Sequence, residues 1–455
     1  MTALLLSFVF LMPFLAKMEA AQPAGCKIRI TNKGLEKLKS ETEKFVEEEL
    51  CNISMPEMMG KEGRFQYTIT DVKITELILA HADLKFIPDV GLLFDIQNSS
   101  ISLSFHRQIL YWFFYDTGNI NASADGVNIN TAVNLIRDYE GRLKINNITC
   151  NAKINRMRAK FSGTLGKVYD FVARFLTTGM RFYLNQRICP ALNHAALVHV
   201  NSLLETIPVR TEVDNYIGID YSLIEDPVMT DQSLDMHFRG MFFDLSHQNL
   251  TLANYAVDPV IREYDRMVYL ALSEFFFDSG MFAYYTAGMF QMDIVDEKMP
   301  KDLEMLLRTT YFGTIMITNP ALMDAPLALR LAVNSPPKTT IKTSGATVFM
   351  TAIVKVMILP PGQPAVQLSS MTMLIPLQAP LKTMLQMSVV PLINNWTKRG
   401  VRIPLADGMD FVEEVVEYHN GFIVIGANLH FSKGLREMMV GGRQRHHHSL
   451  NCEGK

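Results

Sequence analysis

Between residues 64 and 160 the chain alternates between apolar and polar positions over long stretches. The segments RFQYTITDVKITEL, GLLFDIQNSSISLSF, GVNINTAVNLI and GRLKINNITCNAKI show this period of two, and Gly, Asn and Asp separate them. A period of two is typical of β-strands that bury one face. This region therefore predicts several long strands joined by turns.

One of these strands loses its polar face where it ends. Ile101, Leu103 and Phe105 alternate with Ser102 and Ser104, as in the other strands. The next stretch, ILYWFFYDTG (109–118), instead carries aromatic rings at every position from 111 to 115. Such a run places rings on both faces of a strand, which ordinary half-burial does not require.

Apolar residues at helical spacing predict two helices in the first half. The first covers 30–50, and the second is a long helix over 163–205 in which Pro190 is expected to cause a bend or an interruption. A short alternating strand is predicted at 216–223. The apolar spine of the long helix includes Leu165, Val172, Phe175 and Leu176.

The second half repeats this order of elements. We predict a helix over 263–280, strands over 289–296 and 308–317, a helix over 380–400 and a closing strand over 421–431. The same order occurring twice predicts a tandem duplication of one α+β unit. A length of 455 residues agrees, because a single core seldom serves more than about 250–300 residues.

Composition and the N-terminal segment indicate where the protein acts. Charged residues make up 20% of the chain and the net charge is −3. The chain therefore lacks the excess of basic residues that would indicate nucleic acid as a partner. Residues 1–21 contain an apolar run followed by small residues and predict a cleaved signal peptide; an uncleaved anchor is the alternative, because a positive N-terminal region is missing. We expect a secreted, extracellular protein.

Glycosylation sequons and a low cysteine content are consistent with secretion. Five cysteines are too few for a disulfide scaffold, so the fold must depend mainly on its apolar core. We expect glycosylation at the six Asn-X-Ser/Thr sequons. These are Asn52, Asn98, Asn121, Asn147, Asn249 and Asn395.

Several segments resemble one protein family. DRMVYLALSEFFFDSGMFAYYTAG (265–288), RTTYFGTI (308–315), PDVGLLFDIQNSSISLSF (88–105) and GFIVIGANLHF (421–431) are similar to the bactericidal/permeability-increasing protein family, which includes lipopolysaccharide-binding protein and the plasma lipid transfer proteins. The resemblance implies an elongated α+β boomerang of two similar halves. Each half would be a highly twisted antiparallel sheet wrapped around a long helix, and a central sheet would join the halves.

The resemblance also implies what the protein binds. Family members hold phospholipid or related lipids in apolar pockets without catalysis or a cofactor, and one disulfide, which falls here on Cys150 and Cys189, ties a strand to the long helix. Leu165, Val172, Phe175 and Leu176 are expected to line the first pocket, with solid core as the alternative. We expect a lipid-binding monomer, with lipid transfer and lipid binding alone as two alternatives. Innate-immunity recognition of lipopolysaccharide is the alternative function.

In family members the hairpin that matches the aromatic run lies at the free end of the first half. Endotoxin-binding members carry lysines there, whereas this chain offers only His106 and Arg107. Tyr111, Trp112 and Phe114 are candidates for transient contact with a membrane or lipoprotein surface, because such rings favour the membrane–water interface. The alternative is that these rings are packed within the protein.

The resemblance suggests domain boundaries and one departure. We expect a lipid-binding barrel domain at 22–240, a linker and central-sheet region at 241–262, a C-terminal barrel domain at 263–435 and a disordered tail at 436–455. Little chain separates VQLSSMTML from the helix near residue 380, so the second half is expected to be shortened by a hairpin or more. The sequence leaves two alternatives for this half: it keeps a pocket, or the pocket is lost with the missing segment.

The sequence gives little indication of catalysis or of metal binding. Catalytic motifs such as G-x-S-x-G, H-E-x-x-H and the P-loop do not occur, so we expect no enzymatic activity. Three adjacent His residues within RQRHHHSL (443–450) are interpreted as a solvated tail and not as a metal site. No cofactor is expected.

Overall fold

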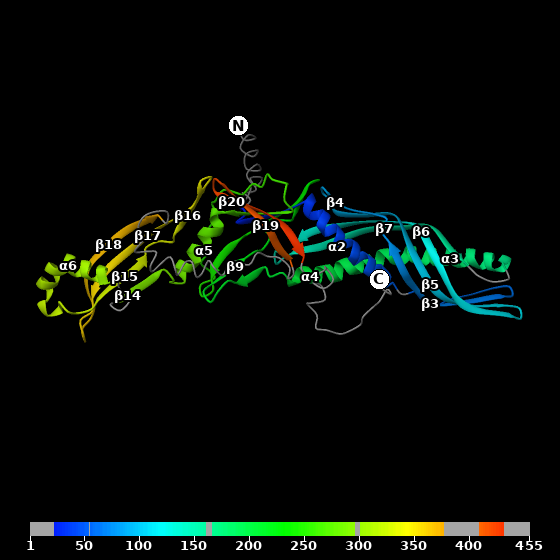
Figure 1. Cartoon of the computed structure of the whole chain (residues 1–455), viewed down its shortest axis with the longest axis horizontal. Coiled ribbons are helices and arrows are strands. Elements are labelled where there is room, and N and C mark those ends of the chain that lie inside the picture. Colours follow the sequence, from blue (N-terminus) through cyan, green and yellow to red (C-terminus); the bar gives the residue numbers. More distant parts are fainter. Residues whose placement is uncertain (1–21, 54, 161–165, 296–300, 377–408, 432–455) are drawn as a thin grey trace, which may run out of the picture.

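The computed structural model is an elongated molecule with a central sheet between two unequal halves (Figure 1). It describes residues 22–53, 55–160, 166–295, 301–376 and 409–431. The first half lies on the right in Figure 1 and the second half on the left. The boomerang-like, two-half α+β architecture that the resemblance implied is confirmed.

Long antiparallel strands and one long helix build the first half. Its sheet has the order β2-β3-β5-β6-β7, with β4 paired to β5, and α3 packs against β7. The strands are β2 (Met58–Glu62), β3 (Phe65–Ile78), β4 (His81–Ile87), β5 (Gly91–Tyr111), β6 (Phe114–Arg137) and β7 (Leu143–Lys160). The helices are α2 (Asn32–Cys51), α3 (Gly166–His194), the π-helix Ala195–Val200 and α4 (Asn201–Thr206). The strands and helices predicted between residues 30 and 206 are thus present.

Pro190 lies inside α3 without ending it. The helix continues to His194 and then widens into the π-helical stretch Ala195–Val200 before α4. Proline removes one backbone donor from the helical hydrogen-bond ladder, and a π-helical turn is one way in which a helix adjusts its pairing. The interruption predicted at Pro190 thus takes the form of a change from α-helical to π-helical pairing a few residues after the proline.

The central sheet contains strands from both halves in the order β10-β11-β1-β13-β20-β19. In each half a strand late in the sequence pairs with the first one, β11 with β1 and β20 with β13, and β1 pairs with β13 between them. The repeat expected from element order is visible here as a near-symmetric arrangement. The strands are β1 (Cys26–Thr31), β10 (Val228–Met229), β11 (Ser233–Phe238), β13 (Val268–Ser273), β19 (Met409–His419) and β20 (Phe422–Phe431).

A small sheet, β12-β9-β8, completes the region between the halves. Its strands are β8 (Arg210–Glu212), β9 (Ile217–Asp220) and β12 (Met241–Asp244). The strand β12, which falls within the region 241–262, pairs with β9 and not with the central sheet. The rest of that region crosses the outer face of the central sheet as irregular chain.

A five-stranded sheet and two helices make up the described part of the second half beyond the central sheet. The sheet has the order β14-β15-β17-β16, with β18 paired to β17, and α6 packs on its inner face. The strands are β14 (Gln291–Val295), β15 (Leu327–Val333), β16 (Lys338–Lys342), β17 (Gly345–Ile358) and β18 (Val366–Pro376). The helices are α5 (Glu274–Thr286), α6 (Lys301–Thr318) and the 3-10 turn Pro320–Leu322.

Two predictions for the second half are wrong. The helix expected over 263–280 is a strand, β13, followed by helix α5, and the strand expected over 308–317 is part of α6. All six residues of β13 are buried, so neither a helical nor an alternating pattern can appear in it. The helix expected over 380–400 lies outside the described residues.

Candidate functional site

The aromatic run forms the turn between β5 and β6 at the free end of the first half (Figure 1). Trp112 and Phe113 make the turn, and Trp112 has a φ of 57°, in the left-handed region that non-glycine residues seldom adopt. Phe113 is 95% exposed, Trp112 57% and Tyr115 59%. The candidates Tyr111 and Phe114 are also exposed. These five residues, 111–115, are called the aromatic tip below.

The alternation stops at this point because the core stops. Along β5 the inward side chains are buried as far as Ile109, which is 2% exposed. Beyond Ile109 the two strands continue as a hairpin whose side chains are exposed on both sides. Exposed apolar patches often mark surfaces that bind a protein or a membrane.

The aromatic tip carries little available positive charge. Arg107, one of two cations that the sequence offered, is buried and forms an ion pair with Asp116 at 2.6 Å. His106 lies on the outer face and hydrogen bonds with Thr117 and Asn119. The sequence did not indicate Arg64, whose guanidinium lies 4.3 Å from the Trp112 ring centre in a cation–π contact.

An apolar interior lies behind the aromatic tip, between α3 and the sheet. Leu176, Met180, Leu184 and Ile188 follow one another at four-residue spacing on the inner face of α3 and are buried. Side chains of β3, β5, β6 and β7 close the interior from the other side. Half-buried Ile53, Met55 and Met58, after the end of α2, lie at its edge.

Of the four residues predicted to line a lipid pocket, the structure describes the side chain of one. Leu176 is on the inner face of α3, within the apolar interior. Leu165 lies outside the described residues, and the side chains of Val172 and Phe175 are not described. The continuing four-residue spacing after Leu176 is the signal that could have added Met180 and Ile188.

The disulfide that the resemblance implied joins Cys150 on β7 to Cys189 on α3, with the Cα atoms 5.5 Å apart. It fixes α3 against the edge strand of its sheet, behind the apolar interior. Cys26, on β1, is buried in the central sheet, where burial raises the pKa of its thiol far above the usual range.

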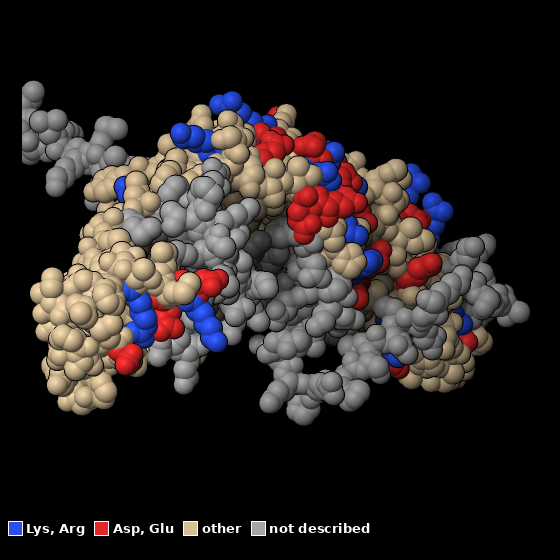
Figure 2. Space-filling view, turned by 60° about the vertical axis from the view of Figure 1, so that its left-hand side comes forward, with Lys and Arg blue, Asp and Glu red and all other residues tan. Residues whose placement is uncertain are grey.

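The far end of the second half is also apolar on its outside. Figure 2 shows mostly uncharged side chains over the end that carries α6. The outer face of α6 exposes Met305, Leu306, Phe312 and Ile317, while its inner face packs on the sheet. A cavity of about 320 Å³ lies beside this helix and is lined by Arg308, Thr309, Phe312, Ile315 and Met323. Its volume is at the lower limit for small-molecule sites.

None of the helices in the described segments combines the length and apolar character that a bilayer-spanning helix needs.

Two halves that share one central sheet, each with a sheet packed around a helix, define the bactericidal/permeability-increasing type of fold. The N-terminal domain model of the LBP / BPI / CETP family matches residues 34–207, and its C-terminal domain model matches 211–377 and 373–431. The chain belongs to this family.

Individual relatives differ widely in similarity. Phospholipid transfer protein from Homo sapiens is 51% identical over 460 residues, covering 93% of each chain. The BPI fold-containing family C protein of Homo sapiens is less similar, with 26% identity over 69% of this chain and 63% of its own. The crystal structure of lipopolysaccharide binding protein matches with a TM-score of 0.63 and 21% identity, over 90% of this chain and 100% of that one.

Proposed function

We propose that this protein is a secreted lipid-binding protein that holds phospholipid or similar acyl-chain lipids and exchanges them with lipid surfaces. The 51% identity with a phospholipid transfer protein over 93% of the chain supports phospholipid as the ligand class. The observation that carries the proposal is the exposed aromatic tip at the end of an apolar interior.

Binding would be driven by burial of acyl chains. Each methylene removed from water stabilises the complex by about 0.8 kcal/mol, so no covalent step and no cofactor is needed. The protein is therefore proposed not to be an enzyme. Leu165, Val172, Phe175 and Leu176 are proposed to line the pocket, and the position of Leu176 on the inner face of α3 supports this assignment. The acyl chains would lie between α3 and the sheet.

The aromatic tip is proposed to make transient contact with a membrane or lipoprotein surface. Tyr and Trp suit the interface because each combines an apolar ring with a polar edge. Arg107 is paired with Asp116 and Arg64 is stacked on Trp112, so attraction to anionic headgroups would be limited to the exposed charge of Arg64. We therefore propose that contact is apolar and weakly dependent on salt. The protein would act as a monomer, and nucleic acid is not a proposed partner.

We propose lipid-binding domains at 22–240 and 263–435, joined through 241–262, with the second shortened. The C-terminal family model matches this chain in two segments, 211–377 and 373–431, which meet at residues 373–377. A match that is split in this way supports a missing segment at that point. The same region ends β18, which pairs with β17 and exposes Leu374. We propose that lipid binds mainly in the first half.

Secretion is proposed with residues 1–21 as the signal peptide and 436–455 as a disordered tail. Five of the proposed glycosylation sites lie on exposed asparagines, which supports their access to a glycosylating enzyme. The sixth, Asn395, lies outside the described residues. The exposed sites are Asn52, Asn98, Asn121, Asn147 and Asn249.

Recognition of microbial lipids such as lipopolysaccharide, in innate immunity, is the alternative function. Lipopolysaccharide-binding protein from Homo sapiens is 29% identical over 63% of this chain, which is less than the 51% over 93% found for phospholipid transfer protein. A phosphate-rich headgroup requires several accessible cations, and at the aromatic tip Arg107 is buried and paired, which leaves Arg64, exposed and stacked on Trp112, as an accessible cation. These contacts favour a neutral phospholipid over lipopolysaccharide.

Native mass spectrometry of the gently purified protein tests the proposed function. We expect co-purified phospholipid, and a lower lipid occupancy in Leu176→Trp, because indole would fill space between α3 and the sheet. Tyr139→Trp, at an exposed turn, is the matched control. Protein that is free of lipid after incubation with phospholipid vesicles would refute the proposal.

A further inference from the structure

Three potential metal ligands converge on the outer face of the central sheet, away from the apolar interior. Glu417 and His419 lie two residues apart on β19, so both side chains project from the same face. Glu263 comes from the irregular segment that crosses this face before β13. One ligand atom from each residue lies within 4.8 Å of the other two.

The sheet and the crossing segment bring these residues together by apolar packing. Ile261 packs against Tyr269, Ala271, Phe422 and Val424 on the outer face of β13 and β20. The register of β19 against β20 sets His419 opposite Phe422 and Glu417 opposite Val424. Burial of Ile261 therefore places Glu263, two residues later, beside the edge strand.

The imidazole of His419 has an unusual environment. The side chain is half-buried, with 32% of its surface exposed, but its Nε2 atom is covered and has no hydrogen-bond partner; Glu417 Oε2, at 3.9 Å, is beyond hydrogen-bonding distance. The ring stacks on Phe422 at 4.9 Å with an interplanar angle of 15°, which fixes its plane. A buried polar atom without a partner is costly and calls for an explanation such as an ion.

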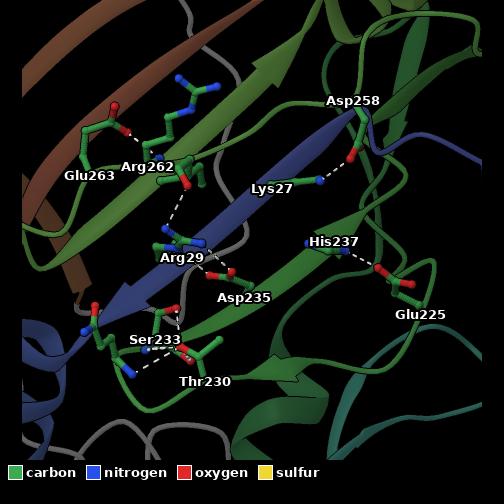
Figure 3. A network of polar contacts seen from close by, with 12 residues as sticks. Lys27, Arg29, Glu225, Thr230, Ser233, Asp235, His237, Asp258, Arg262 and Glu263 are labelled. Atoms are coloured by element: carbon green, nitrogen blue, oxygen red, sulfur yellow. Dashed lines mark hydrogen bonds and ion pairs between the residues drawn. The ribbon is translucent and has the colours of Figure 1, made fainter. Parts of the chain in front are cut away.

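The nearby cations are engaged elsewhere. Figure 3 shows Arg29 bound to Asp235 and Lys27 bound to Asp258 on the same face of the sheet. Glu263 accepts a hydrogen bond from the backbone N–H of Arg262 at 2.9 Å, and within the described part of the chain it has no ion-pair partner. Two carboxylates and one imidazole nitrogen thus face each other, and Arg29, a cation whose charge interacts with that of Glu263, is hydrogen-bonded to Asp235.

We propose that Glu263, Glu417 and His419 bind a divalent transition-metal ion of the zinc type. Zinc takes imidazole nitrogen at about 2.0–2.1 Å and carboxylate oxygen at about 2.0–2.2 Å, usually with four ligands. Ligand atoms around such a tetrahedron are about 3.4 Å apart, so side-chain rotations that move these atoms by about 1 Å assemble the site. An imidazole ligand favours zinc, copper or nickel over calcium or magnesium.

Bound metal would fasten the crossing segment to β19. Glu263 precedes β13, whereas Glu417 and His419 belong to the last hairpin of the second half. The ion would hold these parts, about 150 residues apart in sequence, across the exposed edge of the central sheet. Water would complete the coordination, which is usual where the protein supplies three ligands.

A titration of the metal-free protein with Zn²⁺ and Co²⁺ tests the site. His446, His447 and His448 are first replaced by Ala in every sample, because adjacent histidines bind these ions independently of the fold. We expect one equivalent of Zn²⁺ to bind and to raise the melting temperature, and Co²⁺ to show visible d–d absorption.

The variants H419Q and E263Q identify the ligands. Each is expected to weaken Zn²⁺ binding about 100-fold or more, since even residues that only support a ligand account for 10–100-fold. His247→Gln is the matched control, because His247 is an exposed histidine paired with one carboxylate, Asp244. Equal affinity in H419Q and its parent would overturn the proposal. It would also be overturned if Zn²⁺ left the melting temperature of the parent unchanged.

Discussion

Replacing Phe113 with Ser should detach the protein from neutral lipid surfaces without unfolding it. Complete burial of a Phe side chain is favourable by about 1.5–3 kcal/mol relative to exposure. Phe113 is 95% exposed in the protein, so almost all of this free energy is available to a lipid surface. At about 1.4 kcal/mol per factor of ten, the loss is roughly 10- to 150-fold in vesicle affinity.

The free energy of unfolding should be nearly unchanged in Phe113→Ser. Substitutions at exposed positions usually alter the free energy of unfolding by less than about 0.5 kcal/mol. Tyr139→Ser is the matched control, because Tyr139 is also 95% exposed and lies in the turn at the other end of β6. Flotation with phosphatidylcholine vesicles at low and high salt measures binding, and thermal unfolding measures stability.

The two variants give opposite expectations. Phe113→Ser should lose binding at both salt concentrations, whereas Tyr139→Ser should bind as the parent does. If both variants bind like the parent, the aromatic tip does not contact lipid. A preference for anionic vesicles that disappears at high salt would contradict the apolar mechanism, because salt screens exposed charges.

Three further predictions concern other parts of the structure. With Trp396 replaced by Phe, the emission of Trp112 should shift to the blue on addition of neutral vesicles; an unchanged spectrum would count against insertion. Loss of the disulfide in Cys189→Ala should lower the free energy of unfolding by about 2–4 kcal/mol in denaturant titrations, because the bond closes a loop with a sequence separation of 39 residues. The hydrogen bond from Tyr269 lowers the pKa of Asp265, so this interaction stabilises the fold above the ordinary carboxyl pKa and is lost as pH falls through the lowered value. Tyr269→Phe should therefore reduce stability more at pH 7 than at pH 2, and an equal loss at both values would refute the assignment.

Local pattern was enough to predict the first half. Side chains of β5 alternate in burial up to Ile109, as their apolar and polar sequence does, and α3 shows a helical apolar spine. Such elements bury one face only, so the apolar positions in their sequences show which face points toward the core. The aromatic run marked the end of the sheet, but its exposure depends on where α3 and the neighbouring strands stop.

The second half was harder because its signals are ambiguous. Both faces of β13 are covered in the central sheet, so its sequence is apolar without a period, and helix α6 contains Thr, Tyr and Ile residues that are typical of strands. The pairing of β1 with β11 and β13 joins residues more than 200 positions apart. Glu263 and His419 are also far apart in the sequence, by 156 positions, and they meet because Ile261 anchors the crossing segment.

Photo-crosslinking with a phospholipid that carries a diazirine near the end of its acyl chain tests most directly whether lipid lies between α3 and the sheet. The protein is loaded from vesicles, irradiated and mapped by peptide mass spectrometry. We predict labels on the inner face of α3 around Leu176 and Met180 and on the strands that face them, with weaker labelling in Leu176→Trp. Labels restricted to the outer surface, and equal in the parent and in Leu176→Trp, would contradict the account.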